Sequence, residues 1–140
     1  MNGVRSIALL AARVILGIIF IAHGWQKLHT NGIAGTKAFF ESVNVPAPGF
    51  SAYFATWVEL IGGGLLILGL ALPLVSILLV IDMIGAIVTV HWDNGFWSSD
   101  NGYEFPLALI AGLLAVGFAN AGKLAIDSYV MPGRRGSANS

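Results

Sequence analysis

The chain contains no cysteine among its 140 residues and few charged side chains. Without cysteine it cannot perform thiol–disulfide chemistry by itself, ligate an iron–sulfur cluster or hold a cysteine-ligated zinc ion. Only 10% of its residues are charged, whereas a soluble domain has about 25%. The formal net charge is zero, so there is no basic surface for nucleic acid. These shortages exclude a nucleic-acid-binding protein and do not fit a soluble domain.

Hydrophobic residues make up 56% of the chain and gather in four long runs. Because about 20 apolar residues cross a bilayer as an α-helix, the runs predict an all-α fold, an integral membrane four-helix bundle. Residues 1–130 are expected to form this single domain, and residues 131–140 a polar, disordered C-terminal tail. The predicted spans are Val4–Trp25, Ser51–Leu72, Leu74–Trp92 and Tyr103–Ala121.

The segment between the first two runs is too short and too charged to span a bilayer. Ile33–Val43 mixes apolar residues with a lysine and a glutamate, which is typical of a short helix lying in the membrane interface. Pro46 and Pro48 are expected to end this helix. Pro73 marks a tight turn, so the second and third spans are expected to form an antiparallel hairpin.

The distribution of positive charge predicts the orientation in the membrane. Four spans place both termini on one side, and that side carries most of the arginines and Lys123. The other side carries Lys27 and Lys37 together with several acidic residues. Since positively charged loops stay inside, both termini are expected in the cytoplasm of a multi-pass protein.

Three charged side chains lie inside the apolar runs: Arg13, Glu59 and Asp82. Each costs about 2.5–3.5 kcal/mol at the bilayer centre if it has no partner, so we expect them to pair within the bundle. Arg13 can reach toward Asp82, and the two are interpreted as a structural charge cluster that sets helix register. The same groups also suit a functional role. On a helical wheel one face of the first span gathers Arg13, Gly17, Phe20, Gly24 and Lys27, with His23 at its edge.

A second set of polar residues lies toward the outer ends of the predicted spans. The up-and-down topology brings His23, His91 and Glu104 to one depth, and Glu59 lies about 10 Å below the outer end of its span. We predict that His23, Glu59, His91 and Glu104 form a ligand-binding pocket or a proton relay. No catalytic residue and no metal ligand is assigned.

Several of these residues also have a purely structural interpretation. Each histidine is equally well a hydrogen-bonded boundary residue, and Lys27 is more typical of an interfacial anchor. A regular helix turns His91 about 180° away from Asp82, so His91 either lies past the helix end or contacts other neighbours. Small residues at helix-packing spacing occur at Ala108/Gly112 and Ala115/Ala119, and a homo-oligomer could form through Ala108/Gly112 or Gly62–Gly64.

Short segments in a fixed order resemble the DoxX family of small bacterial membrane proteins. They are Arg13 with Phe20-Ile-Ala-His23-Gly-Trp-Gln-Lys27-Leu, Glu59-Leu-Ile-Gly-Gly, Asp82-Met, Val90-His91 with Gly95-Phe96, and Gly102-Tyr-Glu104-Phe-Pro-Leu. The resemblance implies a four-helix bundle in the bacterial inner (plasma) membrane that is linked to oxidoreductase systems. Family members include the small subunit of a thiosulfate:quinone oxidoreductase and a mycobacterial protein associated with superoxide dismutase and a sulfurtransferase. It carries over no agreed catalytic residue.

Three functions remain open from the sequence, and they differ in whether the chain is part of an enzyme. The first is a membrane subunit of a redox complex that binds a quinone, or a similar apolar redox molecule, near the outer face. The second is a bundle with a histidine-ligated metal or haem. The third is a non-enzymatic scaffold or proton-relay protein. The expected partners are membrane lipid, oxidoreductase subunits and further copies of the chain.

Overall fold

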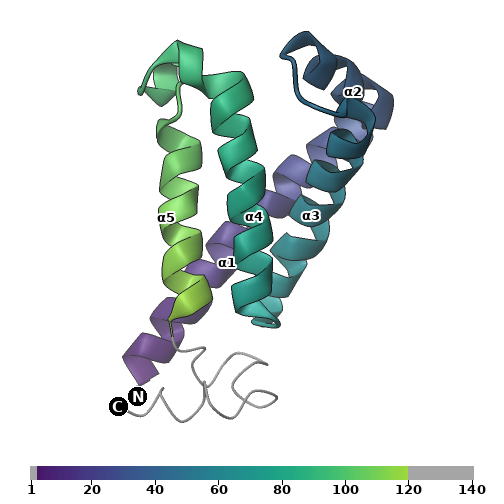
Figure 1. The fold of residues 1–140 in the computed structure, drawn as a ribbon. Helices are drawn as coiled ribbons and strands as arrows, with labels where there is room; N and C mark the ends of the chain where they lie inside the picture. Colours follow the sequence, from purple (N-terminus) through teal and green to yellow (C-terminus); the bar gives the residue numbers. More distant parts are fainter. Residues whose placement is uncertain (1–2, 120–140) are drawn as a thin grey trace.

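The computed structural model describes residues 3–119, and every regular element within them is a helix. The all-α prediction is therefore confirmed for this part of the chain. The predicted tail at residues 131–140 lies outside the described residues. The shorter α2 follows α1 along the chain and lies beside the start of α3, as Figure 1 shows. The helices are α1 Gly3–Trp25, α2 Gly32–Ser42, α3 Pro48–Leu68, α4 Leu72–Ala86 and α5 Glu104–Phe118.

Two of the long helices change their hydrogen-bond pattern in the last turn. α1 continues as a π-helix over Gln26–Thr30, and α4 continues as a π-helix over Ile87–His91. With these turns included, three helices are long and apolar enough to cross a membrane: Gly3–Thr30, Pro48–Leu68 and Leu72–Asn94. The apolar helix α5 is shorter, with 15 residues in the described part of the chain.

Proline and left-handed residues set the boundaries of α3 and α4. Pro48 was expected to end the interfacial segment, but it begins α3, because the first helical turn does not need its missing N–H. Gly69 ends α3 with φ of 72°, a left-handed conformation that glycine adopts without steric cost. Pro73 then lies in the first turn of α4. The hairpin between the two helices turns over residues 69–71.

α1 crosses α3 at a distance that only glycine permits. A Cβ atom on Gly17 would lie 2.5 Å from the carbonyl oxygen of Gly63, and one on Gly63 would lie 2.7 Å from that of Gly17. About two turns further along α1, a Cβ atom on Gly24 would lie 2.9 Å from the backbone nitrogen of Leu60. The face predicted for α1 is buried as expected, since Arg13, Gly17, Phe20 and Gly24 are all buried. The crossing orients the end of α1 toward α3.

All four long helices contribute to one apolar core, and all four also carry large apolar side chains on their outer surfaces. An exposed apolar surface on this scale is unusual in a soluble monomer and is suited to contact with lipid. The core consists of Leu16, Phe20, Leu66, Leu72, Val75, Leu79, Leu109, Leu113 and Val116. The exposed residues include Ile15 and Ile18 on α1, Ile61 and Leu68 on α3, Ile77 and Ile81 on α4, and Leu107 and Leu114 on α5.

The small-residue face expected on α5 is only partly used inside the chain. Ala108 and Ala115 are exposed, so they do not pack inside the chain, and the oligomer contact through Ala108/Gly112 stays a prediction. Gly112 does contact α1, where a Cβ atom would lie 3.3 Å from a methyl group of Leu16. The buried face of α5 consists of Pro106, Leu109, Leu113, Val116 and Gly117.

Candidate functional site

A cavity of about 840 Å³ lies at the end of the molecule where α1 and α4 finish and α3 and α5 begin, the upper end in Figure 1. Most of its wall is apolar or aromatic, and includes Phe20, Phe54, Phe105 and Leu109. Concave apolar walls with a few convergent polar groups are typical of small-molecule sites. The titratable side chains that line it are His23, Lys27, Glu59, Asp82 and His91.

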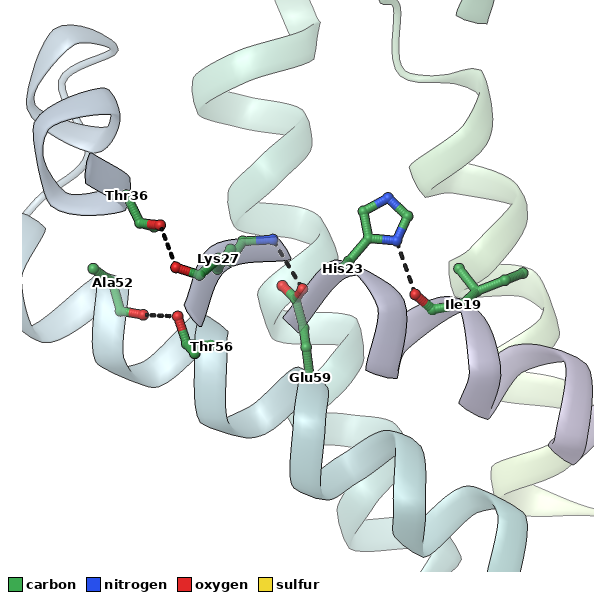
Figure 2. A network of polar contacts seen from close by, with 7 residues as sticks. All are labelled: Ile19, His23, Lys27, Thr36, Ala52, Thr56 and Glu59. Atoms are coloured by element: carbon green, nitrogen blue, oxygen red, sulfur yellow. Dashed lines mark hydrogen bonds and ion pairs between the residues drawn. The ribbon is translucent and has the colours of Figure 1, made fainter. Parts of the chain in front are cut away.

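An ion pair on the cavity wall joins the π-helical end of α1 to α3. The Nζ atom of Lys27 lies 2.9 Å from Oε1 of Glu59, as Figure 2 shows. The Glu59 side chain is 2% exposed and that of Lys27 is 20% exposed. Lys27 is therefore more than an interfacial anchor, which corrects its interpretation from the sequence. The sequence feature that could have revealed this role is the position of Lys27 on the same helical face as Gly24, one turn further along the chain.

Asp82 brings α4 into the same cluster. Its side chain lies beside those of Glu59 and Lys27 and lines the same cavity. Its Oδ2 atom is buried and has no hydrogen-bond partner among the described residues. The cluster thus combines two acidic side chains and one basic side chain.

Both histidines that line the cavity are held in the same way. Nδ1 of His23 lies 2.8 Å from the carbonyl oxygen of Ile19 (Figure 2), and Nδ1 of His91 lies 2.8 Å from that of Asn101. A carbonyl oxygen can only accept, so each Nδ1 carries the hydrogen. In the neutral ring, Nε2 is then left as an acceptor. Each histidine can therefore accept a hydrogen bond or a proton at Nε2.

The π-turn at the end of α4 determines the direction of His91. A π-helix bonds residue i to i+5 and so has about one residue more per turn than an α-helix bonded i to i+4. This extra residue changes the phase of Ile87–His91 relative to Asp82, and both side chains line the cavity. Of the two alternatives left open by the sequence, the second holds, because His91 lies within the π-turn and bonds the Asn101 carbonyl of the loop. π-turns are frequent at functional sites.

The loop between α4 and α5 holds His91 from the other side. It is closed by backbone hydrogen bonds from Tyr103 to the Gly95 carbonyl and from Glu104 to the Phe96 carbonyl, 3.0 and 2.8 Å long. The buried Gly102 packs against Gly95, where a side chain would collide with backbone. The loop thereby presents the Asn101 carbonyl to His91.

The second π-turn, at the end of α1, is fixed by α2. The buried hydroxyl of Thr36 donates a 3.1 Å hydrogen bond to the backbone carbonyl of Lys27. Lys27 is therefore held both at its backbone, by α2, and at its ammonium group, by Glu59 of α3. α2 contributes to the site by positioning Lys27.

Replacing Thr36 by valine is expected to destabilise the protein by about 1 kcal/mol, because the shape is kept while the Lys27 carbonyl loses the hydrogen bond from Thr36. The measurement is the midpoint of thermal unfolding in detergent, which should fall by a few degrees. Thr30→Val is the matched control, since Thr30 is exposed at the end of the same π-turn. Equal midpoints for the two variants would contradict a structural role for the Thr36 bond.

The remaining two predicted residues, Glu104 and Arg13, do not line the cavity. Oε1 of Glu104 accepts a 3.0 Å hydrogen bond from the Ser98 N–H group inside the loop. Arg13 is 1% exposed and lies fourteen residues before Lys27, about 21 Å away along α1. Its predicted pairing with Asp82 stays a prediction. Within residues 3–119, no three His, Cys, Asp or Glu side chains are arranged to hold a metal ion.

The part of the chain that carries the five titratable residues of the cavity wall is similar to known proteins. The sequence model of the DoxX family matches residues 8–92, which is more than half of the chain. This chain belongs to the DoxX family. The matched segment contains His23, Lys27, Glu59, Asp82 and His91, so the whole titratable lining of the cavity falls within the DoxX region. The resemblance found from the sequence motifs is confirmed.

Three relatives place this DoxX protein among bacterial membrane proteins. It is 37% identical over 135 residues to a Bacillus subtilis (strain 168) protein named "Putative oxidoreductase CatD", with 96% of each chain covered. It is 28% identical over 130 residues to the Mycobacterium tuberculosis "Uncharacterized membrane protein Rv3486", covering 86% of this chain and 79% of that one. It is 38% identical over 68 residues to the Escherichia coli "Inner membrane protein YqjF", covering 49% and 48%. No solved structure matches the chain.

Proposed function

We propose that this DoxX protein is the membrane subunit of an oxidoreductase system and that its cavity binds a quinone or a related apolar redox molecule. The observation that carries the proposal is the convergence of the Lys27–Glu59 pair, Asp82 and two histidines in one mostly apolar cavity. The oxidoreductase name of the Bacillus subtilis relative supports a redox setting. The partner subunit would supply or receive the electrons.

The chemistry of a quinone head group fits this lining. The ring is flat and apolar and can lie against the aromatic wall, which includes Phe20, Phe54 and Phe105. Its two oxygen atoms need polar partners. A quinol hydroxyl can donate to Nε2 of His23 or His91, and a quinone oxygen can accept from either ring when that ring carries a second proton. Reduction of a quinone to a quinol consumes two electrons and two protons, so proton-carrying groups beside the oxygens are required. Glu59 and Asp82 both line the cavity and supply carboxyl groups at this position.

The proposal includes a placement in the membrane. α1, α3, α4 and α5 would be four spans, with α2 in the interface and both termini in the cytoplasm. The cavity would then lie near the outer surface. Exposed tryptophans at this end of the molecule support an interfacial position, because tryptophan concentrates at the level of lipid head groups. These are Trp25, Trp92 and Trp97.

The test is a binding titration on purified protein in detergent or nanodiscs. A short-chain ubiquinone analogue is added, and the dissociation constant is measured by isothermal titration calorimetry. His23→Phe and His91→Phe should each raise the constant by about 5–10-fold, because each variant removes a ring nitrogen that hydrogen-bonds a ligand oxygen, as an acceptor for the quinol form or as a protonated donor for the quinone form. The matched control is His29→Phe. His29 is exposed, stacks on Trp25 with ring centroids 3.8 Å apart, and does not line the cavity.

The proposed function fails if the native protein does not bind the analogue. The assignment of the site fails if His29→Phe weakens binding as much as the two cavity variants do. If Lys27 and Glu59 variants lose folded protein while binding per folded molecule is unchanged, the polar cluster is a scaffold that sets helix register.

A further inference from the structure

The cavity reaches the surface of the protein at two places that differ in polarity. At the outer end its rim carries exposed polar residues from the segment after α1 and from the loop between α4 and α5. These are Gln26, Asn31, Ser98 and Asn101. Along α4 the wall extends to Ile81, which lines the cavity and is also 52% exposed. The second opening is therefore on the side of the bundle.

The order of residues around α4 places this side opening next to α3. On a helical wheel, Asp82 marks the α3 side, because it lies beside the ion pair, and Ser76 marks the α5 side, because it packs against Gly117. Ile81 and Gly85 lie beyond Asp82, between the α3 side and the lipid-facing side of α4. Both residues line the cavity. The opening is thus bordered by α3 and α4.

α3 and α4 separate toward the outer end of the molecule. Near the middle of the bundle, a Cβ atom on Gly62 of α3 would lie 3.3 Å from the side chain of Leu79 on α4. Six residues further along α4, about 9 Å, a Cβ atom on Gly85 would meet nothing within 4 Å among the described residues. Figure 1 shows the upper end of α4 apart from α3 in this region. Gly85 therefore borders a passage from the cavity to the side of the bundle.

Contacts join the neighbouring helices on the other sides of the cavity. α1 and α3 are joined by the Lys27–Glu59 ion pair, with 2.9 Å between Nζ and Oε1. α4 and α5 are joined by the loop that holds His91. Between α1 and α5 the rings of His23 and Phe105 have centroids 6.2 Å apart, which is a usual distance for aromatic contact. The space beside Gly85 is the passage that these contacts leave.

The passage faces the hydrocarbon part of the bilayer in the proposed placement. Ile81 lies eleven residues before Trp92, about 16 Å deeper along α4, and the hydrocarbon core is about 30 Å thick. Apolar residues border the passage from both helices, Ile81 and Gly85 on α4 and the half-buried Phe54 on α3. A ligand group that occupies this passage must itself be apolar.

We infer that the ligand carries a long apolar chain, and that this chain leaves the cavity between α3 and α4, across Gly85, into the lipid. The head group stays in the cavity with His23 and His91, on the side of the polar rim. This inference rests on the proposed function and specifies its ligand class. The ligand is a membrane-resident quinone with an alkyl or isoprenoid tail, and not a small water-soluble quinone.

The experiment compares two ligands that share a head group: 2,3-dimethoxy-5-methyl-1,4-benzoquinone without a tail, and the same ring with a decyl chain. Gly85→Leu fills the passage with a side chain. It should weaken binding of the decyl ligand by at least about tenfold, because the chain and the new side chain compete for one space. Binding of the ligand without a tail should stay within about twofold of the native value.

Gly64→Leu is the matched control. Gly64 lies in α3, a Cβ atom there also meets nothing within 4 Å, and the residue does not line the cavity. Gly64→Leu therefore makes the same change of side chain without entering the passage, and it should bind both ligands as the native protein does.

A photolabelling measurement locates the chain in the native protein and does not depend on the folding of a variant. The decyl chain carries a diazirine group, and the labelled residues are identified by mass spectrometry. Labels are expected around Ile81, Gly85 and Phe54. Because α4 also faces lipid, only the labelling that falls with excess unlabelled decyl ligand is counted.

The outcomes separate this inference from the proposed function. A loss in Gly85→Leu confined to the decyl ligand, with competed labels on α3 and α4, supports both. No loss, or an equal loss for both ligands, overturns the passage and leaves the quinone-type site standing. Competed labels around Phe105, between α1 and α5, overturn it as well. If the native protein binds neither ligand, both the passage and the proposed function are overturned.

Discussion

Replacing Lys27 by methionine is expected to destabilise the protein by about 3 kcal/mol or more. The reason is that removal of one partner leaves the Glu59 carboxylate buried beside a second acid without its counter-charge, and breaking a buried pair costs about 3–5 kcal/mol. The lower end of that range applies because the Lys27 side chain keeps 20% exposure. The measurement is the free energy of unfolding in detergent, from a denaturant titration followed by circular dichroism.

Two further variants show whether the loss comes from the unpaired charge. In the double variant Lys27→Met/Glu59→Gln no carboxylate is left unpaired at position 59, so most of the lost stability should return. Lys37→Met removes a lysine from an exposed pair, with 3.9 Å between Lys37 and Glu41 and side chains 52% and 56% exposed. Such pairs contribute about 0–1 kcal/mol. A double variant no more stable than Lys27→Met alone would show that the ion pair is not the cause.

Gly63→Ala is expected to destabilise the protein by about 1–3 kcal/mol, the usual cost of forcing extra atoms into a packed interface. The added methyl group would lie 2.7 Å from the Gly17 carbonyl oxygen and 3.0 Å from the Ile21 backbone nitrogen. Both contacts are with the backbone of α1, which cannot turn away as a side chain can. The two helices must therefore separate, and unfolding should begin at lower denaturant concentration.

The neighbouring residue provides a control in the same helix. A Cβ atom on Gly64 would meet nothing within 4 Å, so Gly64→Ala should be neutral or stabilise by up to about 1 kcal/mol through helix propensity. Separation of α1 from α3 also moves Lys27 relative to Glu59, so Gly63→Ala should weaken ligand binding as well. If both alanine variants had the same stability, the close crossing of α1 and α3 would be refuted.

The helices and the face of α1 that carries Arg13, Gly17 and Gly24 could be predicted from the sequence because they depend on local spacing. Hydropathy runs of about 20 residues and the 3.6-residue period are properties of one segment at a time. The same reasoning found the acids Glu59 and Asp82, because a charged residue inside an apolar run stands out without knowledge of its neighbours. The helix α2 was expected for a similar reason, from its mixture of apolar and charged residues.

The partners of these residues depended on how the helices cross. Lys27, not a residue deep in α1, is the cation beside Glu59, because glycine contacts at Gly17 and Gly24 bring the end of α1 against α3. The direction of His91 depended on a π-turn, and no local pattern predicts where a helix will widen. Glu104, expected in the pocket, is used by its own loop. Helix formation is thus encoded in near neighbours along the chain, whereas the composition of the cavity is decided by contacts between segments that are distant in sequence.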